Sequence, residues 1–122
     1  KIKLAIECNL EAESIKKLAT MVNRENFYIV YDTGNRLKKQ NLQYKEILNL
    51  KIYICHIHLK DKNWKGHNVI LGTGAVNFQS IFKAIKKIKY DGNFTFETNR
   101  GNNPIKTMCE NKSFISNLIQ KL

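Results

Sequence analysis

The sequence predicts an α/β fold in which four strands, each followed by a helix, form a parallel sheet. Four runs of strand length carry alternating or β-branched apolar residues, and each precedes a segment with the apolar spacing of a helix. The chain has 122 residues, 43% of them hydrophobic, which suits one small globular domain. Strict alternation of strands and helices favours parallel strands joined by right-handed crossovers.

The four strands are expected near residues 2–7, 27–32, 52–58 and 94–97. In the first strand every second residue is apolar, and the second strand is rich in β-branched and aromatic residues. Successive side chains of a strand point to opposite faces. In the third strand we therefore expect Tyr53, Cys55 and Ile57 to face the helices, and His56 and His58 to face away from them.

The four helices are expected over residues 11–22, 44–50, 78–88 and 105–122. The third has the clearest pattern, because its apolar residues between Ile81 and Ile88 lie on one stripe. The last helix follows Asn103-Pro104, which supplies an N-cap residue and a proline in the first turn. Residues 60–74 are expected to form a long polar loop.

The length of the repeating unit predicts a larger architecture. An eight-stranded βα barrel of about 250 residues uses roughly 31 residues per unit, and four units in 122 residues come close to that value. The chain is therefore expected to be the C-terminal half of a (β/α)8 TIM barrel, with residues 1–122 as a single partial domain. An open four-stranded αβ sheet is the alternative.

The chain carries a formal net charge of +11, which raises the question of nucleic-acid binding. Only three of its 21 basic residues are Arg, and the lysines fall mostly on the predicted helices. Lysines in that position usually form a solvated helix face, and no basic stretch interleaved with aromatic residues is present. We therefore expect no specific nucleic-acid partner. No apolar run approaches the roughly 18–20 residues needed to span a bilayer, so no membrane partner is expected either.

The three cysteines, Cys8, Cys55 and Cys109, lie far apart and form no CxxC motif. This spacing speaks against a disulfide framework or a structural zinc knuckle. A reducing compartment fits such cysteines better, and we expect a cytoplasmic location.

Four polar residues occur where the predicted strands end: Glu7, Asp32, His58 and Glu97. The carboxyl ends of parallel barrel strands meet at one edge, which holds the active site in such barrels. Three carboxylates that converge there would repel one another unless a cation lay between them. Three oxygen donors and one imidazole suit Mn²⁺, Mg²⁺ or Co²⁺, and Zn²⁺ is also possible. We therefore expect one divalent metal ion at this edge.

Four motifs occur in order along the chain: Asp32-Thr33-Gly34-Asn35, the segment His56–Asp61, the segment Leu71–Phe78 and the segment Tyr90–Glu97. Together with Glu7 they resemble the C-terminal half of the sugar phosphate isomerase/epimerase family, within the xylose isomerase-like TIM barrels. The resemblance covers nearly the whole chain and implies barrel strands 5–8 with their helices.

The resemblance implies that Glu7, Asp32, His58 and Glu97 hold the metal. It also implies that Glu7 and Glu97 are the acid/base pair, on opposite sides of a small sugar or sugar-phosphate substrate. One glutamate removes a proton alpha to a carbonyl while the metal steadies the resulting enediolate.

The resemblance also suggests residues that contact the substrate. Glu13 stands where some ketose epimerases carry another site glutamate, although a solvated helix residue is the alternative. Asn35 stands where some relatives have His. The Arg that others have after the third-strand motif is not evident here, and Lys60, Lys62 or Lys65 is the nearest substitute. His56 is either a substrate residue or a packing residue behind His58. Gly72-Thr73-Gly74 resembles a phosphate-binding turn, with a plain loop as the alternative.

A half-barrel has two open sheet edges and lacks part of the substrate pocket. We expect activity only when the barrel is complete, through a missing N-terminal half or through self-association. Two other functions remain open. An AP-endonuclease-type DNA repair enzyme fits the charge, but its multi-zinc site calls for more histidines than Gly34-Asn35 and Lys60-Asp61 provide. A truncated, non-catalytic αβ module fits the length.

Overall fold

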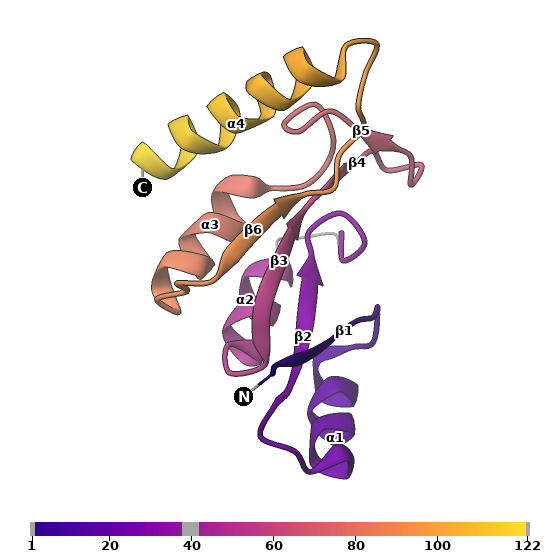
Figure 1. The fold of residues 1–122 in the computed structure, drawn as a ribbon, viewed down its shortest axis with the longest axis vertical. Coiled ribbons are helices and arrows are strands. Elements are labelled where there is room, and N and C mark those ends of the chain that lie inside the picture. The colour runs from indigo at the N-terminus through magenta and orange to yellow at the C-terminus, as the bar shows by residue number, and fades with distance from the viewer. Residues whose placement is uncertain (1, 38–41, 122) are drawn as a thin grey trace.

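The computed structural model describes residues 2–37 and 42–121 and contains the predicted parallel sheet. Its four strands are β1 (Leu4–Glu7), β2 (Phe27–Asp32), β3 (Ile54–Leu59) and β6 (Asn93–Phe96). They lie side by side in the order β1-β2-β3-β6, and each neighbouring pair is parallel (Figure 1). The prediction of four parallel strands, adjacent in chain order, is confirmed.

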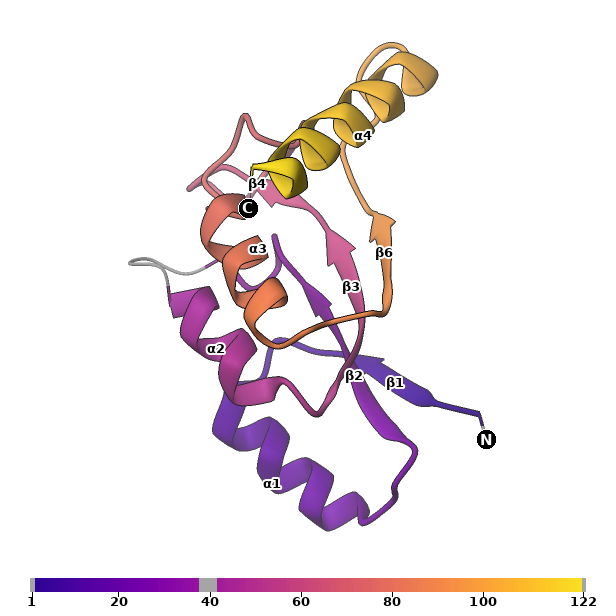
Figure 2. The same cartoon turned by 90° about the vertical axis from the view of Figure 1, so that its left-hand side faces the viewer.

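Four helices alternate with these strands: α1 (Ala12–Val22), α2 (Leu42–Leu50), α3 (Phe78–Lys87) and α4 (Pro104–Gln120). The side chain of Asn77 caps α3 by accepting the N–H of Ser80, and that of Asn103 caps α4 by accepting the N–H of Lys106. The helices α1, α2 and α3 cover one face of the sheet (Figure 2). The expected end of the last helix at Leu122 lies outside the described residues.

The hydrophobic core lies between the sheet and these helices. Ile29 of β2 and Ile57 of β3 are at most 1% exposed, and they face Ile15, Ile47 and Ile81 of the three covering helices. Each fully buried aliphatic side chain of this kind contributes roughly 1.5–3 kcal/mol. One packed face thus fixes the strands, and through them the residues at the strand ends.

The start of β3 differs from the prediction. The register to β2 shifts by one residue, because Ile29 pairs with Ile54 whereas Val30 pairs with His56. Cys55 is the extra residue of this irregularity, so Ile54 is buried in the core where Cys55 was expected. Ile52 precedes the strand and is 67% exposed. Beyond the shift, Ile57 faces the helices as predicted.

The expected polar loop over residues 60–74 contains a small hairpin, and that prediction is wrong in this part. β4 (Asp61–Lys62) pairs antiparallel with β5 (Asn68–Val69). Between them the side chain of Asn63 accepts the N–H groups of Lys65 and His67. Gly66 adopts a φ of 84°, which glycine allows without strain. Strands of two residues carry too little periodicity to be recognised from sequence.

The face of the sheet opposite the helices is open in the part of the chain that the structure describes (Figure 2). Tyr28, Val30 and His56 lie half-buried in the middle of the sheet. On the helix-covered face, the edge residues Leu4 and Phe94 remain 60% and 37% exposed, and Phe94 stacks on Phe82 of α3. Among the described helices, none combines the length and the apolar character that crossing a membrane requires.

Candidate metal centre

Glu7, Asp32, His58 and Glu97 converge at the carboxyl ends of the four strands. One ligand atom from each lies within 4.8 Å of those of the other three. His58 Nδ1 lies between the carboxylates, at 2.7 Å from Glu97 Oε2, 3.3 Å from Glu7 Oε2 and 3.9 Å from Asp32 Oδ2. The pairing of β2 with β3 sets Asp32 directly opposite His58. The strand ends therefore bring these side chains together, as their positions in the sequence predict.

The turn after β2 fixes the orientation of Asp32, which is 1% exposed. Its Oδ1 accepts the backbone N–H groups of Gly34 at 2.9 Å and Asn35 at 2.6 Å. This is the local pattern by which aspartate stabilises turns. The other oxygen, Oδ2, is left pointing toward His58 and the remaining carboxylates.

Lys60 lies inside the cluster and contacts its carboxylates, whereas the sequence led us to expect only a contact with a substrate. Its Nζ is 2.9 Å from Asp32 Oδ2 and also contacts Glu97 Oε1, although Lys60 is only 5% exposed. The hydrogen bond from Lys60 lowers the pKa of Glu97, against the opposing effect of burial. Burial alone would lower the pKa of Lys60, but its bonds to Glu97 and Asp32 raise it overall. Both partners are therefore charged at neutral pH.

Asn35 binds the Glu7 carboxylate oxygen that does not face His58, and Lys62 in turn binds Asn35. Asn35 Nδ2 donates to Glu7 Oε1 at 2.9 Å, and Lys62 Nζ donates to Asn35 Oδ1 at 2.7 Å. Lys62 thus fixes the amide so that its N–H₂ group faces Glu7. The structure places Asn35 beside the cluster, and this position is compatible with its predicted contact with a substrate.

His56 lies next to His58 on the open face of the sheet. The two rings meet edge to face with centroids 5.2 Å apart, and His56 Nε2 is 2.9 Å from Thr95 Oγ1. Burial lowers the pKa of His56, and the proximity of His58 lowers it further. His56 is therefore neutral at physiological pH, and its ring packs against the ring of His58.

Glu13 lies apart from these residues. It is in the first turn of α1, where its exposed carboxylate pairs with Lys16 at 2.8 Å. It is not a member of the cluster. Its contact with a substrate stays a prediction.

The cluster fits a divalent metal ion. Asp32 Oδ2 and His58 Nδ1 are buried atoms without a hydrogen bond of good geometry, and Oδ2 has an ion pair with Lys60. An oxygen and an imidazole nitrogen of this kind are atoms that a metal ion binds. Ligands about 2.0–2.2 Å from one ion lie at most ~4.4 Å apart, so a contraction of a few tenths of an ångström suffices. Within residues 2–37 and 42–121, no other set of three or more His, Cys, Asp or Glu side chains has this geometry.

The role of Asp61 was not predicted from the sequence. Its carboxylate is completely buried and accepts the backbone N–H groups of Gly72 and Gly74 at 2.9 Å and of Val76 at 3.2 Å. The glycine-rich turn that resembles a phosphate-binding loop thus binds a carboxylate of its own chain. Of the two alternatives for this turn, the plain loop is the one observed.

Arg36 is a second residue that the sequence analysis missed. It is 3% exposed, pairs with Glu46 at 2.6 Å, and donates to the carbonyls of Cys8 and Leu10 at 2.8 and 2.7 Å. It therefore fixes the segment that directly follows Glu7. The sequence does contain one indication of this role: Arg36 is an arginine in a lysine-rich chain. An arginine in such a chain often marks a site that needs several hydrogen bonds in a fixed geometry.

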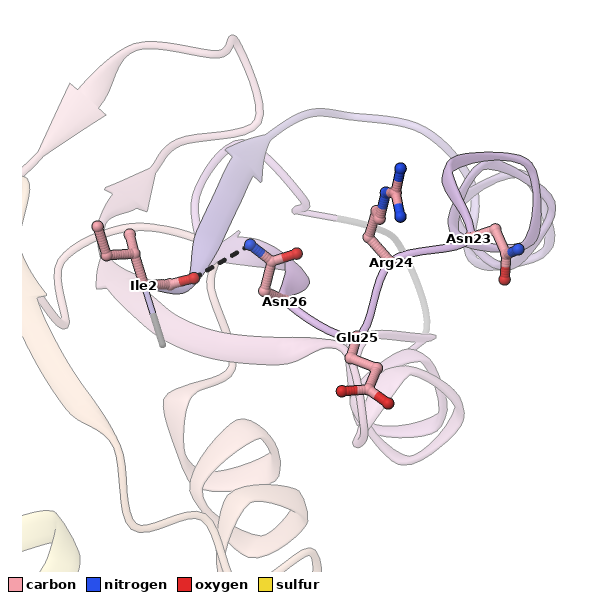
Figure 3. A pocket seen from close by; sticks show the side chains of 5 residues that line it. All are labelled: Ile2, Asn23, Arg24, Glu25 and Asn26. Carbon is pink, nitrogen blue, oxygen red and sulfur yellow. Dashed lines mark hydrogen bonds between the residues drawn. The ribbon is translucent and has the colours of Figure 1, made fainter.

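A large hollow of about 570 Å³ lies elsewhere on the molecule. It is lined by Ile2, Asn23, Arg24, Glu25 and Asn26 (Figure 3). Asn26 Nδ2 donates to the Ile2 carbonyl at 3.1 Å, where β1 and β2 begin. This is the end of the strands opposite to the carboxylates, and barrel enzymes place their chemistry at the carboxyl ends. The hollow is therefore not the candidate site.

Residues 2–118 match the family described as the xylose isomerase-like TIM barrel. The chain belongs to this family. Xylose isomerase-like relatives include an L-ribulose 3-epimerase from Methylomonas sp. (strain DH-1), 33% identical over 94 residues, and a ketose 3-epimerase from Arthrobacter globiformis, 32% identical over 77 residues. The matches cover 75% and 63% of this chain, but only 32% and 25% of those proteins.

Solved structures of xylose isomerase-like proteins share the fold. A xylose isomerase domain protein from Planctomyces limnophilus superposes with a TM-score of 0.82 at 23% identity, over 98% of this chain and 47% of that one. The chain therefore spans about half of such a barrel, which confirms the predicted half-barrel. Similar folds include the IOLI protein with a bound zinc atom and a Mycobacterium smegmatis protein in complex with magnesium, with TM-scores of 0.76 and 0.74.

Proposed function

We propose that this chain supplies the metal-binding half of a sugar or sugar-phosphate isomerase/epimerase of the ketose 3-epimerase type. The observation that carries the proposal is the convergence of Glu7 and Glu97 on His58, beside Asp32 Oδ2, which is buried and paired with Lys60. The names of the two curated relatives support the substrate class.

Glu7 and Glu97 are suited to moving a proton between the two faces of a substrate carbon. Glu7 ends one edge strand, β1, Glu97 directly follows the other, β6, and the two approach His58 from different sides. One carboxylate accepts the proton alpha to the carbonyl, and the other carboxylic acid returns a proton to the opposite face, which inverts that carbon. A bound Mn²⁺, Mg²⁺, Co²⁺ or Zn²⁺ ion would supply positive charge for the oxygen that becomes negative as the proton leaves.

Neighbouring residues keep both carboxylates ready for this exchange. Lys60 holds Glu97 in its ionised form, as a proton acceptor must be, and Asn35 orients Glu7. We propose that His56 and Asn35 contact the substrate directly, because both lie next to the cluster at the open side of the sheet. Direct substrate contacts by Lys60 and Glu13 are proposed on the resemblance alone.

The pocket needs more protein than this chain provides. We propose that four further βα units cover the open face of the sheet, supplied by an N-terminal half or by a second copy of the chain. The match to only 47% of the Planctomyces structure supports the need for a second half. We also propose a cytoplasmic location, because Cys8, Cys55 and Cys109 are all free thiols.

The test uses the complete protein that contains this half, stripped of metal with a chelator and then reloaded with Mn²⁺. We expect the reloaded protein to convert a ketose to its C3 epimer and the stripped protein to be inactive, as followed by proton NMR of the sugar. A Glu110→Gln variant is the matched control, because this glutamate is exposed on α4. Undiminished epimerisation by the stripped protein, or none by the reloaded one, would contradict the proposal.

A further inference from the structure

Lys60 occupies a fixed position among the proposed metal ligands. Its ammonium contacts two of the three carboxylates, those of Asp32 and Glu97. Its backbone is held at both ends by the Thr33 hydroxyl, which donates to the Lys60 carbonyl at 2.6 Å and accepts the Lys60 N–H at 2.9 Å. Its side-chain stem packs against Gly34, where a Cβ atom would come within 2.7 Å of Lys60 Cγ. The ammonium is therefore built into the site.

The charges of the cluster add up in a simple way. Glu7, Asp32 and Glu97 contribute three negative charges, and Lys60 contributes one positive charge. The remaining two negative charges match a single divalent cation. Without Lys60 the same donors would hold an additional negative charge, which would attract a divalent ion more strongly.

We propose that Lys60 is a built-in counter-ion that limits the affinity of the cluster for its metal ion and keeps that ion exchangeable. The inference rests on the proposed metal site. Lys60 is on this account a positioning residue: it neutralises one carboxylate charge and holds Asp32 and Glu97 apart when no ion is bound. A unit charge about 5 Å from a divalent cation, at an effective dielectric constant of about 20, alters affinity by up to roughly 10⁵-fold before screening, and salt, water and movement of the lysine reduce this to the smaller change expected below.

The test is a titration of the purified protein with Mn²⁺, followed by isothermal calorimetry and by the electron paramagnetic resonance signal of the free ion. Lys60→Met removes the charge and keeps an unbranched side chain, and Lys60→Arg keeps the charge. Lys17→Met is the matched control, because it removes one positive charge from an exposed position of α1. We expect Lys60→Met to bind Mn²⁺ about 10–100-fold more tightly than the unaltered protein, with Lys60→Arg and Lys17→Met within about threefold of it.

Gly34→Ala provides a second route, because the added methyl group displaces the Lys60 stem and leaves every charge in the chain. We expect it also to tighten Mn²⁺ binding, and it decides the question if Lys60→Met does not fold. Unchanged or weaker binding in the folded variants, or equal tightening in Lys60→Arg, would overturn the role of Lys60 alone. Absence of Mn²⁺ binding from the unaltered protein and every variant would overturn the proposed metal site as well.

Discussion

The two carboxylate oxygens of Asp32 have separate tasks. Oδ1 accepts two backbone N–H groups of the following turn, and Oδ2 faces His58 and Lys60. In Asp32→Asn the amide carbonyl can keep the turn, but an N–H₂ group then faces the ammonium and offers no ligand. We expect Mn²⁺ affinity to fall by at least about tenfold in a calorimetric titration. Asp91→Asn, in an exposed turn, is the control, and equal affinity of the two variants would remove Asp32 from the ligand set.

Tyr31 makes the stability of the fold sensitive to alkaline pH. It is fully buried and donates to Glu46 Oε2 at 3.0 Å. Burial raises the pKa of Tyr31, and the Glu46 carboxylate raises it further. Since the unfolded chain releases this proton near pH 10, the stabilisation is complete below that pH and is lost as the pH rises above it.

The corresponding experiment is urea unfolding between about pH 9 and 11. Each tyrosine with a raised pKa lowers the free energy of unfolding by up to ~1.4 kcal/mol per pH unit above its unfolded pKa. Tyr90 adds to this slope, because burial raises its pKa to about 12. We expect Tyr31→Phe to show a shallower loss of stability than the unaltered chain. Identical slopes would contradict this explanation.

The positions of single residues could be predicted only in part. Strand-end residues such as Glu7 and Asp32 were predictable, because parallel strands bring their carboxyl ends to one edge whatever the loops do. The contacts of Lys60 and Arg36 were not, since a long side chain can reach many groups and the sequence does not say which are near. Lys60 was expected near the substrate, and the structure shows it bonded to two of the carboxylates.

At the scale of elements, the loop from β5 to α3 depends on one buried carboxylate. Asp61 accepts the N–H groups of Gly72, Gly74 and Val76, and that of Val76 is buried away from water. We expect Asp61→Ala to lower the free energy of unfolding by about 1–3 kcal/mol, because the buried N–H of Val76 loses its acceptor. Urea unfolding measures the loss, and amide exchange at the three donors should accelerate.

Asp91→Ala is the control for this variant, since a surface substitution of that kind usually changes stability by no more than about 0.5 kcal/mol. A loss of similar size in both variants would show that Asp61 does not hold the loop.

Helices and long strands were predictable because their apolar periods of 3.6 and 2 repeat often enough to be recognised. The shift at Cys55 and the hairpin of β4 and β5 leave no such repeat. Both depend on how strands meet in three dimensions. The shift changes which residue enters the core, Ile54 instead of Cys55, and leaves the orientation of Ile57 and His58 as the alternation predicts.

At the scale of the whole molecule, the candidate site lies on a sheet that corresponds to about half of the matched barrel. The edge strands β1 and β6 each pair on one side only within the described structure, and apolar groups at the edges, such as Leu4, are exposed. If further βα units complete a barrel, as proposed above, additional strands pair with these edges and cover Tyr28 and Val30. All four candidate ligands nevertheless lie at or directly after the ends of the four strands of this chain.

The most direct test of the proposed proton transfer is the deuterium content of a ketose recovered from D₂O after incubation with the complete, Mn²⁺-loaded protein. We expect the unaltered protein to introduce deuterium at the carbon alpha to the carbonyl, and Glu97→Gln and Glu7→Gln to slow this exchange by about 10²–10⁴-fold, because an amide cannot carry the proton. Lys89→Gln is the control on the opposite end of the sheet, and metal content is measured for every variant. Full deuterium exchange in metal-loaded Glu97→Gln would contradict the account, since another group would then move the proton.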